Sequence, residues 1–270
     1  MHKERILRVF SALLQMLLAP LWLPLWILRY RGHALDGVLR ARETLVRETW
    51  VNARAQRSGL VRVNPFEAFP GLALQKGFLS AEHWGSSHDR VEYPLLTALC
   101  AHLRPRWIFE FGTFHGEATL LFARSCPEAR ITTLNIPGRK DPKLGLDFQQ
   151  RSELLMEEKI GICFRGTPEA SRIEQILLDS ADLDPSHHQG RYDWIWVDAG
   201  HSYECVCNDS DKAFEMVAPG GYVFWHDFDP TQKGVVRCLT ERARSRKLCW
   251  IDRTSLVYWR APGEARPKSF

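Results

Sequence analysis

The side chains most able to do chemistry follow two apolar runs of the sequence. Asp198 ends the run WIWVD, and His201 follows it three residues later. His226 and Asp227 end a second run, YVFWHD. If the two runs are neighbouring parallel strands, about 5 Å apart, the two acids can converge in one cleft. Carboxylates can hold a divalent cation that lowers the pKa of a bound hydroxyl, and a histidine can take its proton at neutral pH.

A glycine-containing loop after an earlier apolar run predicts a second binding site. The run WIFEF leads into the stretch EFGTFHG, from Glu110 to Gly116. Gly112 and Gly116 let the backbone turn tightly, and a helix beginning near Gly116 directs free N–H groups toward an anionic group. A dinucleotide site would prefer the closer spacing GxGxxG. Glu110, inside the strand end, instead suits the ammonium group of an amino-acid cofactor.

An alternation of short apolar runs and helical patterns must position these two groups. We expect strands at residues 107–111, 130–135, 173–178, 194–198 and 222–226. We expect helices at residues 93–103, 116–124, 148–159, 203–217 and 235–246. An antiparallel pair at residues 247–251 and 256–260 closes the sheet. The pattern predicts an α/β fold with a doubly wound, Rossmann-like sheet that is mostly parallel and ends in an antiparallel strand.

The polar residues of greatest interest fall at the ends of the expected strands. They are Glu110, Asn135, Asp179, Asp198 and Asp227. Open parallel sheets bind their ligands beyond the carboxyl ends of the strands. The sequence therefore predicts that the functional site lies along this edge of the sheet.

The N-terminus is unusual because residues 9–28, VFSALLQMLLAPLWLPLWIL, contain no charged side chain. The run is long enough to cross a bilayer as a helix. Pro20 and Pro24 would break a straight helix, while Trp22 and Trp26 suit the headgroup region. We expect a membrane contact rather than a cleaved signal peptide, because Arg29 follows directly and no small-residue cleavage site is present. Spanning the bilayer and lying on its surface both stay open.

The remaining composition is typical of a globular enzyme in a reducing compartment. The net charge of +4 is mild and does not indicate nucleic-acid binding. Seven cysteines without CxxC spacing predict buried free thiols. After a membrane-contacting segment at residues 1–30, we expect a helical linker or lid at 31–80 (irregular over 61–75), a domain at 81–262 and a disordered tail at 263–270. The protein is then cytoplasmic, or held at the cytoplasmic face of a membrane.

Several motifs in the same order resemble one family. EFGTFHGEAT is similar to motif I of class I S-adenosylmethionine (SAM) dependent methyltransferases. RGTPEASRIEQILLDSADLD, YDWIWVDAGHSYE and NDSDKAFEMVAPGGYVFWHDF resemble the group that includes the macrolide O-methyltransferases and cephalosporin hydroxylase-like proteins. The resemblance covers roughly residues 82–260 and not the first sixty. It is specific for the fold and the cofactor, and weaker for the substrate.

The resemblance implies a set of SAM-binding residues along the strand ends. It assigns the methionine part of SAM to the motif I residues and the ribose to the residue that ends the second strand. Asp179 and Ser180 would lie near the adenine. The full set is Glu110, Gly112, Thr113, Gly116, Asn135, Asp179 and Ser180. Asn135 is a departure, because the family usually has an acid there; losing the charge-assisted hydrogen bond should weaken SAM binding by about 1 kcal/mol.

The resemblance also implies a divalent metal and a general base. Relatives that use a metal have acids at the positions of Asp198, His226 and Asp227, and a base at the position of His201. We therefore expect the first three residues as metal ligands, with Asp198 and His201 as catalytic residues. His226 is the second departure, because Mg²⁺ prefers oxygen ligands whereas imidazole suits Mn²⁺, Fe²⁺ or Zn²⁺ better. His226 could instead be a second acid–base group or orient the acceptor.

These observations predict a SAM-dependent methyltransferase that methylates a hydroxyl oxygen with the help of Mg²⁺ or Mn²⁺. The acceptor would be a small molecule, a sugar or, given residues 9–28, a lipid-linked compound at a membrane surface. The alternative is a non-catalytic, membrane-tethered scaffold on the same fold, which Asn135 and His226 would suit. A dehydrogenase is disfavoured because GxGxxG and an acid after the second strand are both missing. The oligomeric state is left open.

Overall fold

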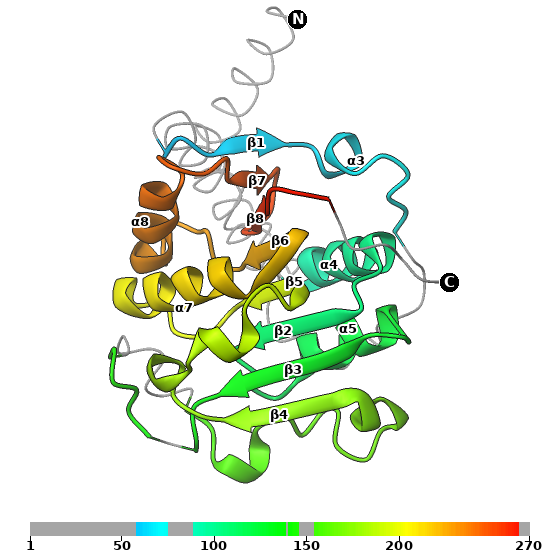
Figure 1. Ribbon diagram of the computed structural model, residues 1–270, viewed down its shortest axis with the longest axis vertical. Helices are drawn as coiled ribbons and strands as arrows, with labels where there is room; N and C mark the ends of the chain where they lie inside the picture. The colour runs from blue at the N-terminus through cyan, green and yellow to red at the C-terminus, as the bar shows by residue number, and fades with distance from the viewer. Residues whose placement is uncertain (1–57, 75–88, 139, 146–153, 265–270) are drawn as a thin grey trace, which may run out of the picture. The chain divides into compact units, whose positions relative to one another are not determined.

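The strand-forming runs of the chain meet in one β-sheet (Figure 1). The computed structural model describes residues 58–74, 89–138, 140–145 and 154–264, which all lie within one unit of residues 53–270. Within the described residues, eight strands pair in the order β1-β7-β8-β6-β5-β2-β3-β4. The strands are β1 Val61–Val63, β2 Trp107–Phe111, β3 Arg130–Asn135, β4 Ile173–Leu177, β5 Tyr192–Val197, β6 Val217–Trp225, β7 Cys249–Ile251 and β8 Val257–Arg260.

The pairing confirms the predicted fold class. Strands β4, β3, β2, β5 and β6 pair with one another in parallel, whereas β8 runs antiparallel to both β6 and β7. The central strands β2 and β5 have apolar side chains on both faces, as is typical of parallel strands covered by helices on both sides. Strand order reverses between β2 and β5, and a reversal of this kind opens a crevice at the carboxyl ends of the two strands.

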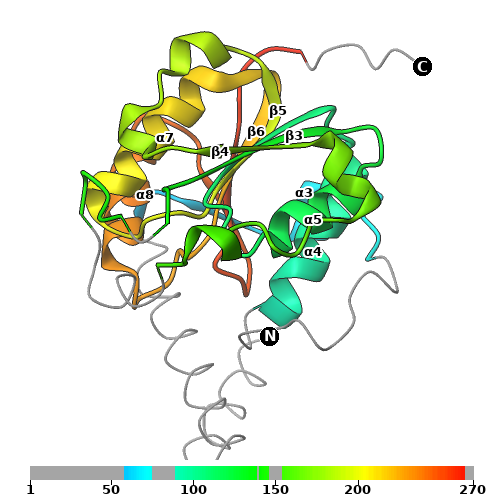
Figure 2. The same cartoon turned by 90° about the horizontal axis from the view of Figure 1, so that it is seen from below.

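Helices cover the two faces of the sheet (Figure 2). Helices α4 Asp89–Leu103 and α5 Glu117–Ser125 lie on one face, and α7 Tyr203–Met216 and α8 Lys233–Arg242 lie on the other. Helix α7 begins where the Ser202 hydroxyl accepts a hydrogen bond from the backbone N–H of Cys205. It ends at Met216, and strand β6, which contains Pro219, Gly220 and Gly221, follows directly.

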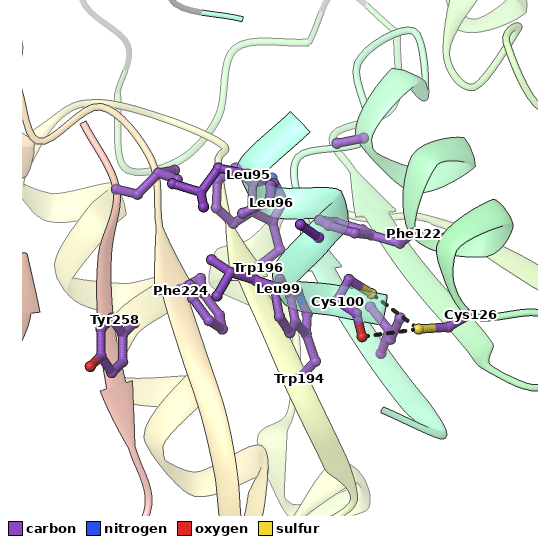
Figure 3. Close-up of a cluster of buried hydrophobic side chains, with 14 of the residues drawn as sticks. Leu95, Leu96, Leu99, Cys100, Phe122, Cys126, Trp194, Trp196, Phe224 and Tyr258 are labelled. Atoms are coloured by element: carbon purple, nitrogen blue, oxygen red, sulfur yellow. Dashed lines mark hydrogen bonds between the residues drawn. The ribbon is translucent and has the colours of Figure 1, made fainter. Parts of the chain in front are cut away.

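The core between α4, α5 and the sheet combines aromatic rings with aliphatic side chains (Figure 3). Trp194 and Phe224, on neighbouring strands, stack with ring centroids 4.0 Å apart. Phe122 of α5 meets Trp194 edge to face, and Leu96 and Leu99 of α4 are fully buried in the same cluster. These tryptophans are therefore packing residues rather than ligand contacts. All seven cysteines are free, as expected, and five of them are buried.

Residues 61–63 correct the sequence analysis. An irregular linker is expected over residues 61–75, but Val61–Val63 forms strand β1 and pairs in parallel with β7. The short run Val-Arg-Val alternates apolar and charged side chains. Arg62 forms an ion pair with Asp252, which lies just beyond the end of β7. Asn64 then caps a one-turn helix, α3 Pro65–Ala68, by accepting a hydrogen bond from Phe66 N–H. A strand of three residues, followed directly by a one-turn helix, is too short to show the alternating pattern by which strands are recognised in a sequence.

Two expected helices also differ from the structure. The helix expected at residues 148–159 falls partly outside the described residues. Its described end, residues 154–159, contains only a 3₁₀-helix at Glu157–Lys159. The helix expected to reach Arg246 ends at Arg242. The remaining predicted helices agree with the structure to within one residue, apart from α4, which begins at Asp89, four residues before its expected start.

Several expectations lie outside the described residues. They concern residues 9–28, most of 31–57 and 75–88, and the tail after residue 264. In the part of the chain that the structure describes, no helix is both long and apolar enough to cross a bilayer. The predicted membrane contact of residues 9–28 therefore stays a prediction.

Candidate active site

The loop after β2 is shaped by glycines at positive φ. Gly112 has φ of +98°, and a Cβ added there would lie 2.0 Å from the backbone oxygen of Asp198. Its N–H donates to the carbonyl of Leu134, so the loop is fixed against both β3 and the end of β5. Gly116, with φ of +90°, begins α5 without a side-chain cap. The structure therefore shows no side-chain cap for the first N–H groups of α5, and the predicted contact of these groups with an anionic ligand stays a prediction.

Glu110 lies behind this loop rather than in the open site. Its carboxyl is completely buried and accepts hydrogen bonds from the hydroxyls of Thr119 and Thr133 through Oε2. Oε1 has no hydrogen-bond partner within the described residues. Burial raises the pKa of Glu110 to about 8, although both hydroxyls act in the opposite direction. Thr113 is also buried, and its hydroxyl lies 2.7 Å from that of Thr133.

A cavity of about 150 Å³ opens between the ends of the strands. Four residues of the predicted SAM-binding set line it: Gly112, Asn135, Asp179 and Ser180. Asp198, which is predicted as a catalytic residue and metal ligand, lines it as well. Glu110, Thr113 and Gly116 are not among the lining residues. Leu154 and Leu155 also contribute, which the sequence analysis misses because it assigns them to a helix. The cavity thus lies where the strand order reverses, as expected for this class of sheet.

Two polar residues hold the cavity walls through backbone contacts. Asn135 accepts a hydrogen bond from Phe114 N–H at 3.0 Å through Oδ1, and donates to the Ile136 carbonyl at 2.9 Å through Nδ2. Asp179 accepts from the N–H groups of Ala181 at 2.9 Å and Lys143 at 2.8 Å. An amide at position 135 therefore closes the motif I loop onto β3.

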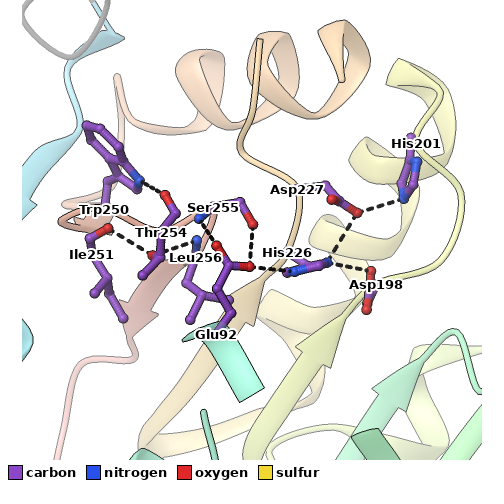
Figure 4. A network of polar contacts seen from close by, with 10 residues as sticks. All are labelled: Glu92, Asp198, His201, His226, Asp227, Trp250, Ile251, Thr254, Ser255 and Leu256. Atoms are coloured by element: carbon purple, nitrogen blue, oxygen red, sulfur yellow. Dashed lines mark hydrogen bonds and ion pairs between the residues drawn. The ribbon is translucent and has the colours of Figure 1, made fainter. Parts of the chain in front are cut away.

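A charged cluster lies beside the cavity, at the ends of β5 and β6 (Figure 4). His201 Nε2 is 2.9 Å from Asp227 Oδ2. His226 Nδ1 is 3.3 Å from Asp198 Oδ1 and 3.3 Å from Asp227 Oδ2. Asp227 has φ of +60°, an uncommon backbone conformation that brings its side chain back toward the other three. The structure thus brings together all four residues that the sequence selects for chemistry.

Opposite charges shift the titration of this cluster. Burial alone would lower the pKa of His226, but the carboxylates of Asp227 and Asp198 raise it well above its ordinary value. The pKa of His201 is also raised, because Asp227 outweighs the effect of burial. Burial would raise the pKa of Asp227, yet the two imidazoles hold it well below its ordinary value. The cluster therefore has alternating negative and positive groups.

One member of the cluster is missed by the sequence analysis. Glu92, on α4, is 2 % exposed, and its Oε2 lies 2.8 Å from Nε2 of His226. The backbone N–H and hydroxyl of Ser255 also donate to this carboxylate. Glu92 is the only acid in the sequence VEYPLLTAL and belongs to no recognisable motif. The only signal available is an acid on the apolar face of a buried helix.

The donor set at this place fits a divalent cation. Asp198, His201 and Asp227 each offer one ligand atom, and these atoms all lie within 4.8 Å of one another. Two carboxylates with imidazole nitrogen suit Mn²⁺, Fe²⁺ or Zn²⁺ chemically, whereas Mg²⁺ prefers an all-oxygen set. Asp198, with its neighbours Ala199 and Gly200, lines both the cavity and the small pocket that holds the cluster. The cavity and the pocket of the charged cluster therefore share a wall at residues 198–200.

Comparison with solved structures finds likenesses of low sequence identity. TomG, an O-methyltransferase from Streptomyces achromogenes in complex with SAM, is 18% identical over 80% of this chain and 98% of that chain, with a TM-score of 0.44. The O-methyltransferase NovP is 20% identical over 63% and 79%, with a TM-score of 0.48. A methyltransferase from Podospora anserina with bound SAH is 13% identical over 67% and 80%, with a TM-score of 0.45. These likenesses do not assign a reaction.

A sequence family is more informative. No curated protein matches the chain. A family described as a methyltransferase domain matches residues 109–228, which run from β2 through the glycine loop to the residue after Asp227. The match spans the cavity-lining strand ends and the whole charged cluster except Glu92. Residues 109–228 of the chain therefore match a methyltransferase domain, on a sheet with reversed strand order and a glycine loop after β2.

Proposed function

We propose that this methyltransferase transfers the methyl group of SAM to a hydroxyl oxygen, assisted by a divalent cation. The observation that carries the proposal is the position of Asp198. This residue lines the cavity through its place after β5 and also belongs to the cluster with His201 and Asp227. A methyl donor in the cavity would then lie next to groups that can bind and deprotonate a hydroxyl.

The cavity residues support the assignment of SAM-binding roles. We assign the ribose hydroxyls to Asn135 and the adenine to Asp179 and Ser180, because all three residues line the cavity. Gly112, Thr113 and Gly116 would receive the methionine part through backbone N–H groups at the start of α5. Glu110 lies behind Gly112, and its Oε1 is the atom that would face the ammonium group.

The proposed chemical step is a direct displacement. The acceptor O–H gives its proton to His201, its oxygen forms a bond to the methyl carbon, and the C–S⁺ bond breaks. The bonding pair stays on sulfur, which leaves S-adenosylhomocysteine (SAH). Asp227 holds the His201 imidazole in place through the 2.9 Å contact. Asp198 and Asp227 would hold a cation, which would lower the pKa of a bound hydroxyl and would offset the carboxylate charge that raises the pKa of His201.

Calorimetry tests the cofactor assignment, and labelled SAM tests the reaction. We expect the chain to bind SAM and SAH with micromolar dissociation constants, about −8 kcal/mol. Methyl-labelled SAM, with Mg²⁺ or Mn²⁺, should label phenol, catechol or sugar hydroxyls in an acceptor panel, and a chelator should abolish the labelling. Labelling confined to amines or carbon acids would contradict the proposal.

The acceptor class depends on residues 9–28. A small molecule or sugar suits the domain alone, whereas an apolar N-terminal run favours a lipid-linked acceptor presented at a membrane surface. Full-length protein should sediment with anionic lipid vesicles, and a chain without residues 1–30 should stay in the supernatant. Equal sedimentation of both forms would remove the reason to screen lipid-linked acceptors.

A further inference from the structure

A pair of cysteine side chains joins the two helices on one face of the sheet. Helices α7 and α8 pack against each other there (Figure 2). Sγ of Cys207, on α7, lies 2.8 Å from Sγ of Cys238, on α8. A disulfide bond is about 2.05 Å long, so the two sulfur atoms are about 0.8 Å from bonding distance. Neither cysteine lines the cavity or the pocket of the charged cluster.

The two thiols have different surroundings. Cys207 is partly exposed, whereas Cys238 is completely buried. Hydrogen bonding to Cys238 lowers the pKa of Cys207, and the Tyr203 hydroxyl and the Arg242 guanidinium act in the same direction, against burial. The same contact, together with burial, raises the pKa of Cys238. Because the thiolate is the nucleophile in cysteine chemistry, Cys207 is the thiol that a reagent from solvent meets first.

A second close thiol pair lacks these properties. Sγ of Cys100, on α4, lies 3.4 Å from Sγ of Cys126, directly after α5 (Figure 3). Both side chains are buried, and burial raises the pKa of Cys100 well above its ordinary value. The Cys126 thiol also donates a hydrogen bond to the Cys100 carbonyl. The pair between α4 and α5 is therefore an internal control for the pair between α7 and α8.

The starts of α7 and α8 are in tight contact beside the catalytic half of the site. Helix α7 begins two residues after His201, and α8 begins six residues after Asp227. Gly234, in the first turn of α8, packs against His201, because a Cβ added to it would lie 2.2 Å from the His201 carbonyl oxygen. The two helices therefore have no room to come closer at this point.

The thiol pair lies about one helical turn beyond this contact. Cys238 follows Gly234 by four residues on α8, and Cys207 follows His201 by six residues. The side chains of His201 and Asp227 meet at 2.9 Å on the other side of the same contact. A covalent bond between the two sulfur atoms would therefore close a ring that includes the proposed base and its carboxylate partner.

We propose that Cys207 and Cys238 form a reversible disulfide when the protein meets hydrogen peroxide or an organic hydroperoxide, and that this bond slows methyl transfer by fixing α7 against α8. The effect on methyl transfer rests on the proposed function, whereas the disulfide itself does not. Neither cysteine touches the substrate or the cofactor, so both act only through the positions of the two helices.

The oxidation needs one equivalent of peroxide. The Cys207 thiolate attacks one peroxide oxygen; an S–O bond forms, the O–O bond breaks, and hydroxide (or alkoxide) leaves, which gives a sulfenic acid. Sγ of Cys238 then attacks the sulfenic sulfur, the S–S bond forms, and the S–O bond breaks. The departing hydroxide takes the Cys238 proton and leaves as water. Two electrons thus pass from the two sulfur atoms to the peroxide.

The disulfide should change turnover rather than cofactor binding. Closing the gap of about 0.8 Å between the sulfur atoms must move one helix along or around the other, because Gly234 already touches His201. A misplacement of about 1 Å can cost a catalytic group about 10²-fold in rate, and we expect a loss of about tenfold here. Gly112 and Asn135 lie on other elements, so the affinity for SAH should stay the same.

Peptide mapping of the full chain tests the disulfide without any assay of activity. The protein is treated with hydrogen peroxide, alkylated under denaturing conditions and digested, and the peptides are weighed. We expect a linked pair of peptides that contain Cys207 and Cys238, which dithiothreitol separates, while Cys100 and Cys126 stay alkylated. Oxidation of Cys207 to a sulfinic acid without a linked peptide, or a link between Cys100 and Cys126 instead, overturns the proposal.

Variants of the pair separate the two chemical steps. In Cys238→Ser the reaction should stop at the sulfenic acid of Cys207, which a 1,3-diketone probe traps, and in Cys207→Ser no sulfenic acid should form. Cys207→Ser changes the partly exposed position, so it keeps the test available if Cys238→Ser does not fold. Cys126→Ser is the matched control and should form the disulfide like the unsubstituted chain. Equal probe labelling of Cys207→Ser and Cys238→Ser overturns the assignment of Cys207 as the reacting thiol.

Rates of methyl transfer before and after oxidation test the consequence. Turnover should fall about tenfold in the cross-linked protein and return with dithiothreitol, whereas Cys238→Ser should show no dithiothreitol-reversible loss. Undiminished turnover by the fully cross-linked protein overturns the proposed effect on catalysis. A linked peptide in a protein that methylates no hydroxyl in the panel would instead sink the proposed function and leave the disulfide standing.

Discussion

The carboxyl groups at the ligand-binding edge fall into two regions with opposite electrostatics. In the cofactor half, Glu110 near the end of β2 and Asp209 on α7 are buried beside hydroxyl and amide donors. Burial raises their pKa values to about 8 and about 6. In the catalytic half, at the ends of β5 and β6, the imidazoles of His201 and His226 hold the pKa of Asp227 well below its ordinary value.

This difference gives the two halves opposite pH dependence. A carboxyl whose pKa is raised on folding destabilises the native state as the pH rises from its unfolded pKa through its folded one. A carboxyl whose pKa is lowered stabilises the native state above its unfolded pKa, and the contribution is lost as the pH falls through the folded one. Burial thus disfavours the ionised forms of Glu110 and Asp209 in the cofactor half. The catalytic half keeps Asp227 ionised, which suits a cation.

The largest effect we expect separates the two halves by function. His201→Asn removes the proposed base of the catalytic half and leaves the cavity lining intact. The turnover number with a hydroxyl acceptor should fall by about 10²- to 10⁴-fold, while the dissociation constant for SAH changes less than threefold. His188→Asn is the matched control, because His188 contacts Tyr192 at the opposite end of β5 and should leave turnover unchanged. A large loss of SAH affinity in His201→Asn would mean that the halves are not separable.

A change at Gly112 acts on the cofactor half. A Cβ would lie 2.0 Å from the Asp198 backbone oxygen, and φ of +98° is unfavourable for any other residue. Gly112→Val should weaken SAH binding at least 100-fold, about 3 kcal/mol, in calorimetry. Gly166→Ala is the control, since Gly166 has φ of +74° and nothing within 4 Å. It should lose about 1 kcal/mol of stability and keep its SAH affinity. Normal binding by a folded Gly112→Val protein would exclude the glycine loop as the cofactor site.

The sequence predicts both halves because strand ends are easy to locate. Apolar runs such as WIFEF and WIWVD mark buried parallel strands, and the first polar residue after each must lie at the ligand-binding edge. Asp198 and Asp227 lie at this edge for that reason, directly after β5 and just beyond the end of β6. The depth of Glu110 was not predictable: it lies under the glycine loop rather than in the cavity, because the partners that bury it, Thr119 and Thr133, come from other elements.

The parts that the sequence analysis missed depend on distant contacts. Glu92 lies 134 residues before His226 and 163 before Ser255, so no local pattern links them. Strand β1 is three residues long and exists because β7, 188 residues later, offers an unpaired edge. Periodicity describes one element at a time, whereas these features arise only when elements pack.

A buried acid of α7 tests the pH dependence of the cofactor half. The folded pKa of Asp209 is about 6, above an unfolded value of about 3.9, so its ionisation costs stability as the pH rises from about 4 through 6. Asp209→Asn should raise the free energy of unfolding at pH 8 by about 1 to 2 kcal/mol and leave it nearly unchanged at pH 4. Urea unfolding at both pH values measures this. Asp211→Asn, on the exposed side of the helix, should show no such difference. A loss of stability at pH 8 in Asp209→Asn would mean that the contacts of the ionised carboxylate outweigh the cost of burying its charge.

The smallest effect concerns Asn135, the neutral member of the five polar residues expected at the strand ends. Its Oδ1 accepts the Phe114 N–H at 3.0 Å, and an aspartate could keep this contact. Its Nδ2 donates to the Ile136 carbonyl at 2.9 Å. In an aspartate, the oxygen at this position would be repelled by the carbonyl oxygen in the free protein. In the complex, the same aspartate oxygen would accept a hydrogen bond from a ribose hydroxyl. Asn135→Asp should therefore lower the melting temperature of the free protein slightly and tighten SAH binding about fivefold, about 1 kcal/mol. Calorimetry and thermal unfolding with and without SAH measure both changes. Weaker SAH binding by Asn135→Asp would show that the cofactor half selects a neutral group at the ribose position. The electrostatic contrast between the two halves would then include the residue at the end of β3 as well.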